Sequence, residues 1–151
     1  MSANPFDLHS ALLARHAQHV VLVHFPIALS MVSWVFEVLA RWRRSPALAA
    51  AAYYNLVGAA TSSLAAVATG LAAWQLQFSG ARLRGNLRLH LVFALVCSVL
   101  LWVLWFMRAR DRRTGQAPSV LYFVMATLAA AAIALTGHLG GFLSGVNGGS
   151  N

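Results

Sequence analysis

Residues 20–40 read VVLVHFPIALSMVSWVFEVLA, and Glu37 is the one acidic or basic residue among them apart from His24. An α-helix rises 1.5 Å per residue, so a run of roughly 20 residues crosses the roughly 30 Å hydrocarbon core of a bilayer. The run does not alternate between polar and apolar positions, as a strand of a membrane barrel would. It therefore predicts a transmembrane α-helix.

Three further runs of the same character lie near residues 47–75, 87–107 and 120–143. Of the 151 residues, 60% are hydrophobic and only 9% are charged, whereas soluble domains carry about 25% charged residues. The links between the runs are too short to hold another domain. We therefore expect one all-α domain over residues 1–151, an integral membrane four-helix up-down bundle. Asn4–His16 is expected to form a short N-terminal interfacial helix, with Pro5 as its first residue.

The net charge of +8 comes from 11 basic residues, all of them arginine. They cluster in the loops that flank the runs, a pattern typical of membrane topology signals rather than of a nucleic-acid interface. The loops after the first and third runs are the richer in arginine, and such loops lie on the cytoplasmic side. We therefore expect a multi-pass protein of the bacterial inner membrane with both termini periplasmic and lipid as its surroundings.

Three histidines from three different runs are expected in one shallow layer near the outer face. His24 lies near the outer boundary of the first run, His90 lies three residues past Leu87, and His138 lies five residues before Leu143. Ionisable side chains within membrane spans are rare, face the bundle interior, and mark cofactors or pathways. We expect these three imidazoles to converge on the interior, and His9 and His16 to lie outside the cluster.

Imidazole is a ligand for Fe, Cu and Zn, and two facing imidazoles supply the axial pair of a haem b. Small residues next to His90 and His138 would leave space for a porphyrin: Ala94, Cys97, Ala131 and Ala134. Three arginines of the outer loop could bind haem propionates or lipid headgroups: Arg82, Arg84 and Arg88. Cys97 is the only cysteine, so the sequence has no motif for covalent haem.

The run His19-Val20-Val21-Leu22-Val23-His24-Phe25-Pro26-Ile27-Ala28-Leu29 resembles the signature H-P-x-x-V-H-F-P-I-A-L of a bacterial membrane family, domain of unknown function 2231. The stretches Ala68–Trp74 and Thr136–Gly141 are also similar to that family. The resemblance implies four transmembrane helices, and its occurrence beside cytochrome domains implies electron transfer. Val20 stands where the family has proline. If His19 also faces inward, the chain has enough histidines for two bis-histidine haems.

The leading hypothesis is a haem b membrane subunit that passes electrons between a quinone pool and a redox partner, such as a cytochrome subunit, at the outer face. His24 and His90 are the expected axial pair, with His138 as a nearby contact. One alternative is a Cu, Zn or non-haem Fe site made by the same histidines. Another is a cofactor-free structural subunit of a respiratory or photosynthetic complex. No set of residues for hydrolysis or phosphoryl transfer is visible, so we expect an electron carrier rather than an enzyme by itself. Glu37 is expected to pair with Arg41, one helical turn away.

Overall fold

The computed structural model describes residues 15–77 and 84–143, so most of the predicted interfacial helix Asn4–His16 lies outside the described residues. The described chain folds into four α-helices: α2 (Arg15–Arg43), α3 (Pro46–Gln77), α4 (Gly85–Thr114) and α5 (Val120–Leu143). Each helix contains its predicted run, and all four are long and apolar enough to cross a membrane. The prediction of an all-α membrane protein with four helices is confirmed.

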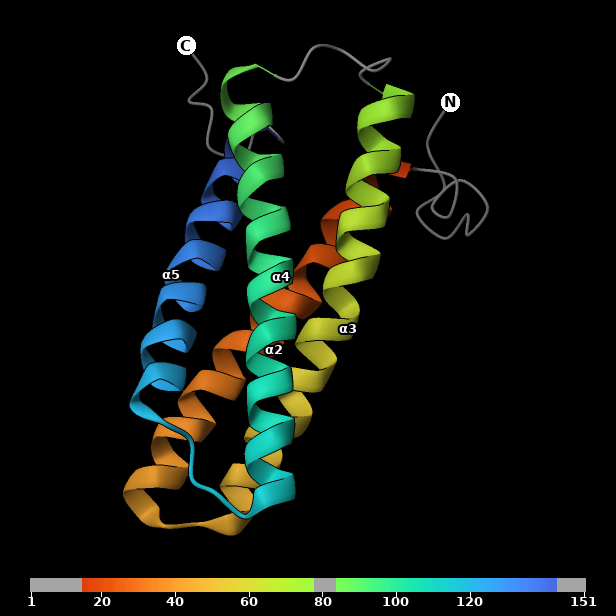
Figure 1. The fold of residues 1–151 in the computed structure, drawn as a ribbon. Coiled ribbons are helices and arrows are strands. Elements are labelled where there is room, and N and C mark those ends of the chain that lie inside the picture. Colours follow the sequence, from red (N-terminus) through yellow and green to blue (C-terminus); the bar gives the residue numbers. More distant parts are fainter. Residues whose placement is uncertain (1–14, 78–83, 144–151) are drawn as a thin grey trace.

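The helices run up and down, so that α2 and α4 point one way and α3 and α5 the other (Figure 1). Contacts join α2 to α3, α3 to α4, α4 to α5 and α5 to α2. The helices therefore form a ring in which α2 and α4 are diagonal partners. We call the end where α2 and α4 begin the histidine end, because His19, His24, His90 and His138 all lie toward it. The opposite end is the arginine end.

The two links at the arginine end follow from local turn chemistry. Ser45 caps α3, because its Oγ accepts a bond from the Leu48 backbone N–H at 3.4 Å, and proline follows at position 46 as the first helical residue. Gly115 ends α4 in the left-handed conformation, with φ +68°. Ser119 caps α5 through a 3.2 Å bond from the Tyr122 N–H.

The buried core lies at mid-height and toward the arginine end. It contains residues of α3, α4 and α5: Leu56, Ala59, Ala60, Cys97, Leu101, Leu104, Tyr122, Ala129 and Ile133. At the histidine end the packing is looser. None of the described residues 18–25, 84–96 or 134–143 is buried, and buried positions there come from α3, at Ala66 and Ala73.

A buried ion pair joins the diagonal helices α2 and α4 at the arginine end. The Arg108 Nη2 lies 3.0 Å from the Glu37 Oε1, and the Arg108 Nε donates to the Glu37 Oε2 at 3.2 Å. Both residues are about 95% buried. The expectation that Glu37 pairs with Arg41 was wrong, because Glu37 lies on the inward face of α2 whereas Arg41 stacks over the Phe123 ring at 5.4 Å.

Candidate functional site

His90 sits between α4 and α5 at the histidine end. Its Nδ1 lies 3.1 Å from the backbone carbonyl oxygen of Thr136. Its ring fits against Gly140, where a Cβ would come within 3.2 Å of the His90 Cε1. Real Cβ contacts are rarely this short, so the glycine makes the space that the imidazole occupies. His90 is thus held on one side by a hydrogen bond and on another by backbone.

His19 is held in the same manner between α2 and α3. Its Nδ1 lies 3.1 Å from the Thr69 Oγ1, and a Cβ at Gly70 would approach the His19 Cε1 to 2.9 Å. The Thr69 hydroxyl also lies 2.9 Å from the Ala65 carbonyl of its own helix, to which it can donate. We call these two arrangements the imidazole seats: His19 against Thr69 and Gly70, and His90 against Thr136 and Gly140.

Hydrogen bonding fixes the tautomer of His90 and favours the same one for His19. A carbonyl oxygen only accepts, so the Nδ1 of His90 carries the proton and its lone pair is on Nε2. The Thr69 hydroxyl has the Ala65 carbonyl as an acceptor of its own, which favours Nδ1–H on His19 as well. A histidine that donates Nδ1–H to a fixed oxygen and keeps Nε2 basic is the arrangement typical of metal-bound imidazole.

His24 and His138 are placed differently from the seated pair. His24 is exposed and donates its Nδ1–H to the carbonyl of Val20, one turn back in its own helix, at 2.6 Å. His138 is also exposed and packs edge-on against the Phe142 ring, with 4.9 Å between centroids. Helices α2 and α5 are in contact close to these two histidines, because the Ile27 Cδ1 of α2 lies 3.7 Å from the position of a Cβ on Gly137 of α5.

The expected convergence of His24, His90 and His138 on the interior was therefore wrong for two of the three. Other residues fill the buried positions of α2 and α5, such as Ser33 and Ile133, whereas His24 and His138 are exposed. Among the described residues, no three side chains of His, Cys, Asp or Glu lie close enough to hold a metal ion. A cofactor hypothesis cannot rest on that trio.

The remaining predicted site residues lie partly outside the described ranges. Arg84 and Arg88 are exposed at the start of α4, near the histidine end. Arg82, His9 and the side chain of His16 lie outside what the structure describes. The role of these arginines toward propionates or headgroups stays a prediction.

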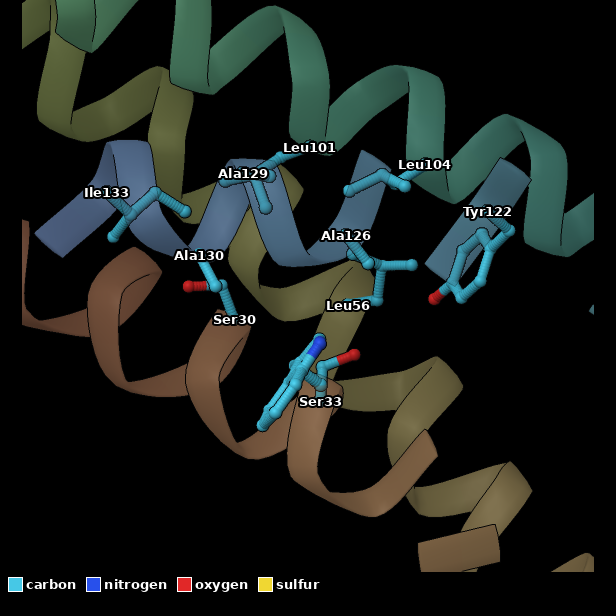
Figure 2. Close-up of a pocket in the computed structure, with 11 residues that line it drawn as sticks. Ser30, Ser33, Leu56, Leu101, Leu104, Tyr122, Ala126, Ala129, Ala130 and Ile133 are labelled. Carbon is cyan, nitrogen blue, oxygen red and sulfur yellow. The ribbon is translucent and has the colours of Figure 1, made fainter. Parts of the chain in front are cut away.

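A small cavity lies nearer the middle of the bundle (Figure 2). Its volume is about 20 Å³, which is room for about one water molecule. Side chains from all four helices line it, and Ser30, Ser33 and Tyr122 contribute its polar groups. It is far too small for a porphyrin.

Sequence reasoning missed two features. The Glu37–Arg108 pair joins residues 71 positions apart, and the His19 seat joins residues 50 apart, so neither has a local signal. The repeated dipeptide Thr-Gly, at 69–70 and 136–137, could have drawn attention to the two threonines, although the glycine that faces His90 is Gly140.

One comparison with known proteins gives a match. A family model described as "Predicted membrane protein", domain of unknown function 2231, matches residues 15–150. No curated protein and no solved structure matches the chain. The match covers all four helices and both seats, and it agrees with the resemblance seen in the residues 19–29. The chain belongs to the membrane protein family of domain of unknown function 2231.

Proposed function

We propose that this chain is a haem b subunit of the bacterial inner membrane that passes electrons between a quinone pool and a redox partner at the outer face. In this proposal both termini and the histidine end face the periplasm, and the partner is another membrane or cytochrome subunit. The chain acts as an electron carrier rather than an enzyme by itself.

The observation that carries the proposal is the seat of His90. The Thr136 carbonyl, 3.1 Å away, fixes the ring orientation and leaves Nε2 as the basic nitrogen. An imidazole with one nitrogen anchored on a neighbouring helix is ready to bind a metal at the other, because its orientation is set before the ligand arrives. His90 is also half-buried, at the contact between α4 and α5.

A haem suits this donor set better than a bare metal ion does. A structural Zn or Cu site needs three or four protein ligands, and the described residues bring no such group together. A haem brings four nitrogens of its own and takes one or two more from histidine. Its iron takes up and releases a single electron, which is the chemistry the group would supply.

The chain's other contributions are position and surroundings. The described residues of α2, α4 and α5 at the histidine end are less buried than those of the core, and the proposal places the haem at this end. Arg84 and Arg88, exposed beside this end, would pair with propionate groups through charge-assisted hydrogen bonds. The core toward the arginine end separates this site from the opposite membrane face.

The test is a reduced-minus-oxidised absorbance spectrum of the detergent-purified protein, with pyridine haemochrome analysis for stoichiometry and elemental analysis for metals. We expect a haem b band at about one haem per chain, and its loss in His90→Ala. Leu89→Ala is the matched control, because Leu89 is an exposed neighbour on the same turn. Metal without haem would favour a His-ligated Cu, Zn or non-haem Fe protein. Neither haem nor metal would favour a cofactor-free structural subunit.

A further inference from the structure

The inward faces of α2 and α4 are related by a constant shift of 71 residues. Glu37 and Arg108, which meet in the ion pair, differ by 71, and so do His19 and His90. Between these two levels, every buried position of α2 has a buried counterpart in α4. These pairs are Pro26 with Cys97, Ser30 with Leu101, and Ser33 with Leu104.

The two imidazole seats repeat in the same manner. Each threonine is followed by glycine and donates its hydroxyl to the carbonyl four residues earlier, at 2.9 Å for Thr69 and 2.7 Å for Thr136. Each lies at the Nδ1 of a histidine near the start of the preceding helix, Thr69 through its Oγ1 and Thr136 through its backbone carbonyl oxygen. The hairpin α2–α3 thus corresponds to the hairpin α4–α5. In a ring of four helices with alternating direction, this correspondence is a pseudo-two-fold axis along the bundle.

The ion pair locates this axis. The atoms of Glu37 and Arg108 approach to 3.0 Å, so these two equivalent positions face each other across the centre. His19 precedes Glu37 by 18 residues, and His90 precedes Arg108 by 18. At 3.6 residues per turn, 18 residues make five whole turns. His19 and His90 therefore lie on the same two faces as the ion pair, about 27 Å along the helices.

His24 does not share that face. It precedes Glu37 by 13 residues, which places it about 140° around the helix from Glu37 at 100° per residue. Its exposure and its hydrogen bond to the carbonyl of its own helix agree with this position. Of the two described histidines near the start of α2, only His19 lies on the helix face that carries Glu37.

We propose that His19 and His90, related by the pseudo-two-fold axis, are the pair that supplies two axial nitrogens to one haem through their Nε2 atoms. This inference rests on the proposed function and replaces His24 by His19 as the partner of His90. Each ring has an oxygen of the neighbouring helix at its Nδ1, a hydroxyl for His19 and a backbone carbonyl for His90, and a glycine of that helix against its Cε1. Both rings would therefore use Nε2 toward a ligand. A six-coordinate haem asks for two such ligands from opposite sides of its plane.

The decisive experiment compares His19→Ala with His24→Ala, two variants five residues apart in one helix. We expect His19→Ala and His90→Ala to lose the six-coordinate, low-spin haem spectrum, and His24→Ala to keep it at wild-type haem content. Size-exclusion elution and helical circular dichroism report folding. Loss of haem in His24→Ala with retention in His19→Ala would overturn the inference while leaving the proposed function intact. Absence of haem from the wild type would overturn both.

Rescue separates ligation from a structural role. In His19→Gly, added imidazole should restore the low-spin spectrum, because a free ligand replaces the lost nitrogen but not a lost helix contact. Failure of rescue, with the protein folded, would count against ligation by His19.

A measurement without haem tests the geometry. In a Cys97→Ala background, cysteines placed by His19→Cys and His90→Cys should be joined by a short bis-maleimide, whereas those from His24→Cys and His90→Cys should not. The opposite result would contradict a shared axis, whatever the haem content.

Discussion

Two glycines are explained by the imidazoles that they face. A Cβ at position 70 would lie 2.9 Å from the His19 ring, and one at position 140 would lie 3.2 Å from the His90 ring. At Gly137, by contrast, the nearest atom is the Ile27 Cδ1 at an ordinary 3.7 Å. Two of these three glycines are therefore needed for space at a ring, although all three lie in helices where alanine is intrinsically preferred.

We predict that Gly70→Ala and Gly140→Ala each destabilise the protein, by about 1–3 kcal/mol, because the added methyl displaces a ring that is hydrogen-bonded to a neighbouring helix. Gly137→Ala should be neutral or slightly stabilising. Thermal unfolding in detergent, followed by size-exclusion, compares the three. Equal effects at positions 137 and 140 would show that crowding at the imidazole is not the cause.

The ion pair at the arginine end allows a charge-reversal test. Removing one partner, as in Glu37→Gln or Arg108→Met, leaves the other buried charge without its ion pair. We expect the free energy of unfolding to fall by about 3–5 kcal/mol. The exchange Glu37→Arg with Arg108→Glu should recover most of this loss, because the two positions are equivalent across the axis. Thermal unfolding of single and exchanged variants checks this, with the exposed Arg110→Ala as control. An exchange as damaging as its single changes would speak against equivalence.

At the scale of helices, a buried hydrogen bond ties α3 to α4. The Ser63 and Ser98 hydroxyls lie 2.8 Å apart. Because Ser63 donates to the Ala60 carbonyl at 2.7 Å, Ser98 is the donor between them. The bond links the hairpin α2–α3 to the hairpin α4–α5, and it lies on the side of the small cavity that is nearer the histidine end.

We predict that the two serines have a small interaction free energy in unfolding, since hydrogen bonds between membrane helices contribute about 0.6 kcal/mol on average and at most about 1.7 kcal/mol. A double-mutant cycle with Ser63→Ala and Ser98→Ala, measured by thermal unfolding in detergent, gives the value. Strictly additive effects would mean that the serines stabilise only their own helices.

Helix positions were predictable from the sequence, whereas helix faces were not. Apolar runs and the signals at Ser45, Pro46 and Ser119 give the spans to within a few residues, because membrane insertion and capping are local effects. Which side of α2 faces inward depends on partners far along the chain. His24 has the more conspicuous sequence context, beside Phe25 and Pro26. The structure shows that Glu37 faces inward, and the spacing of 18 residues then places His19 on the same face.

At the scale of the whole molecule, the arginine distribution predicts orientation. Cysteines introduced by Ser2→Cys and Ser45→Cys, in a Cys97→Ala background, should react with a membrane-impermeant maleimide from opposite sides of intact cells. We expect Ser2→Cys to label from outside and Ser45→Cys only after the membrane is opened. The reverse pattern would place the histidine end in the cytoplasm and move the site of electron exchange to that face.

The Glu37–Arg108 contact has a consequence for how such a molecule can be encoded. Two separate copies of one hairpin would form a symmetric homodimer, in which a residue on the axis meets its own copy. Such a dimer would place carboxylate against carboxylate or guanidinium against guanidinium. When both halves belong to one polypeptide, each position can mutate independently, so that one half carries the acid and the other the base. Covalent fusion thus permits opposite charges at one end of the axis while identical imidazoles are kept at the other.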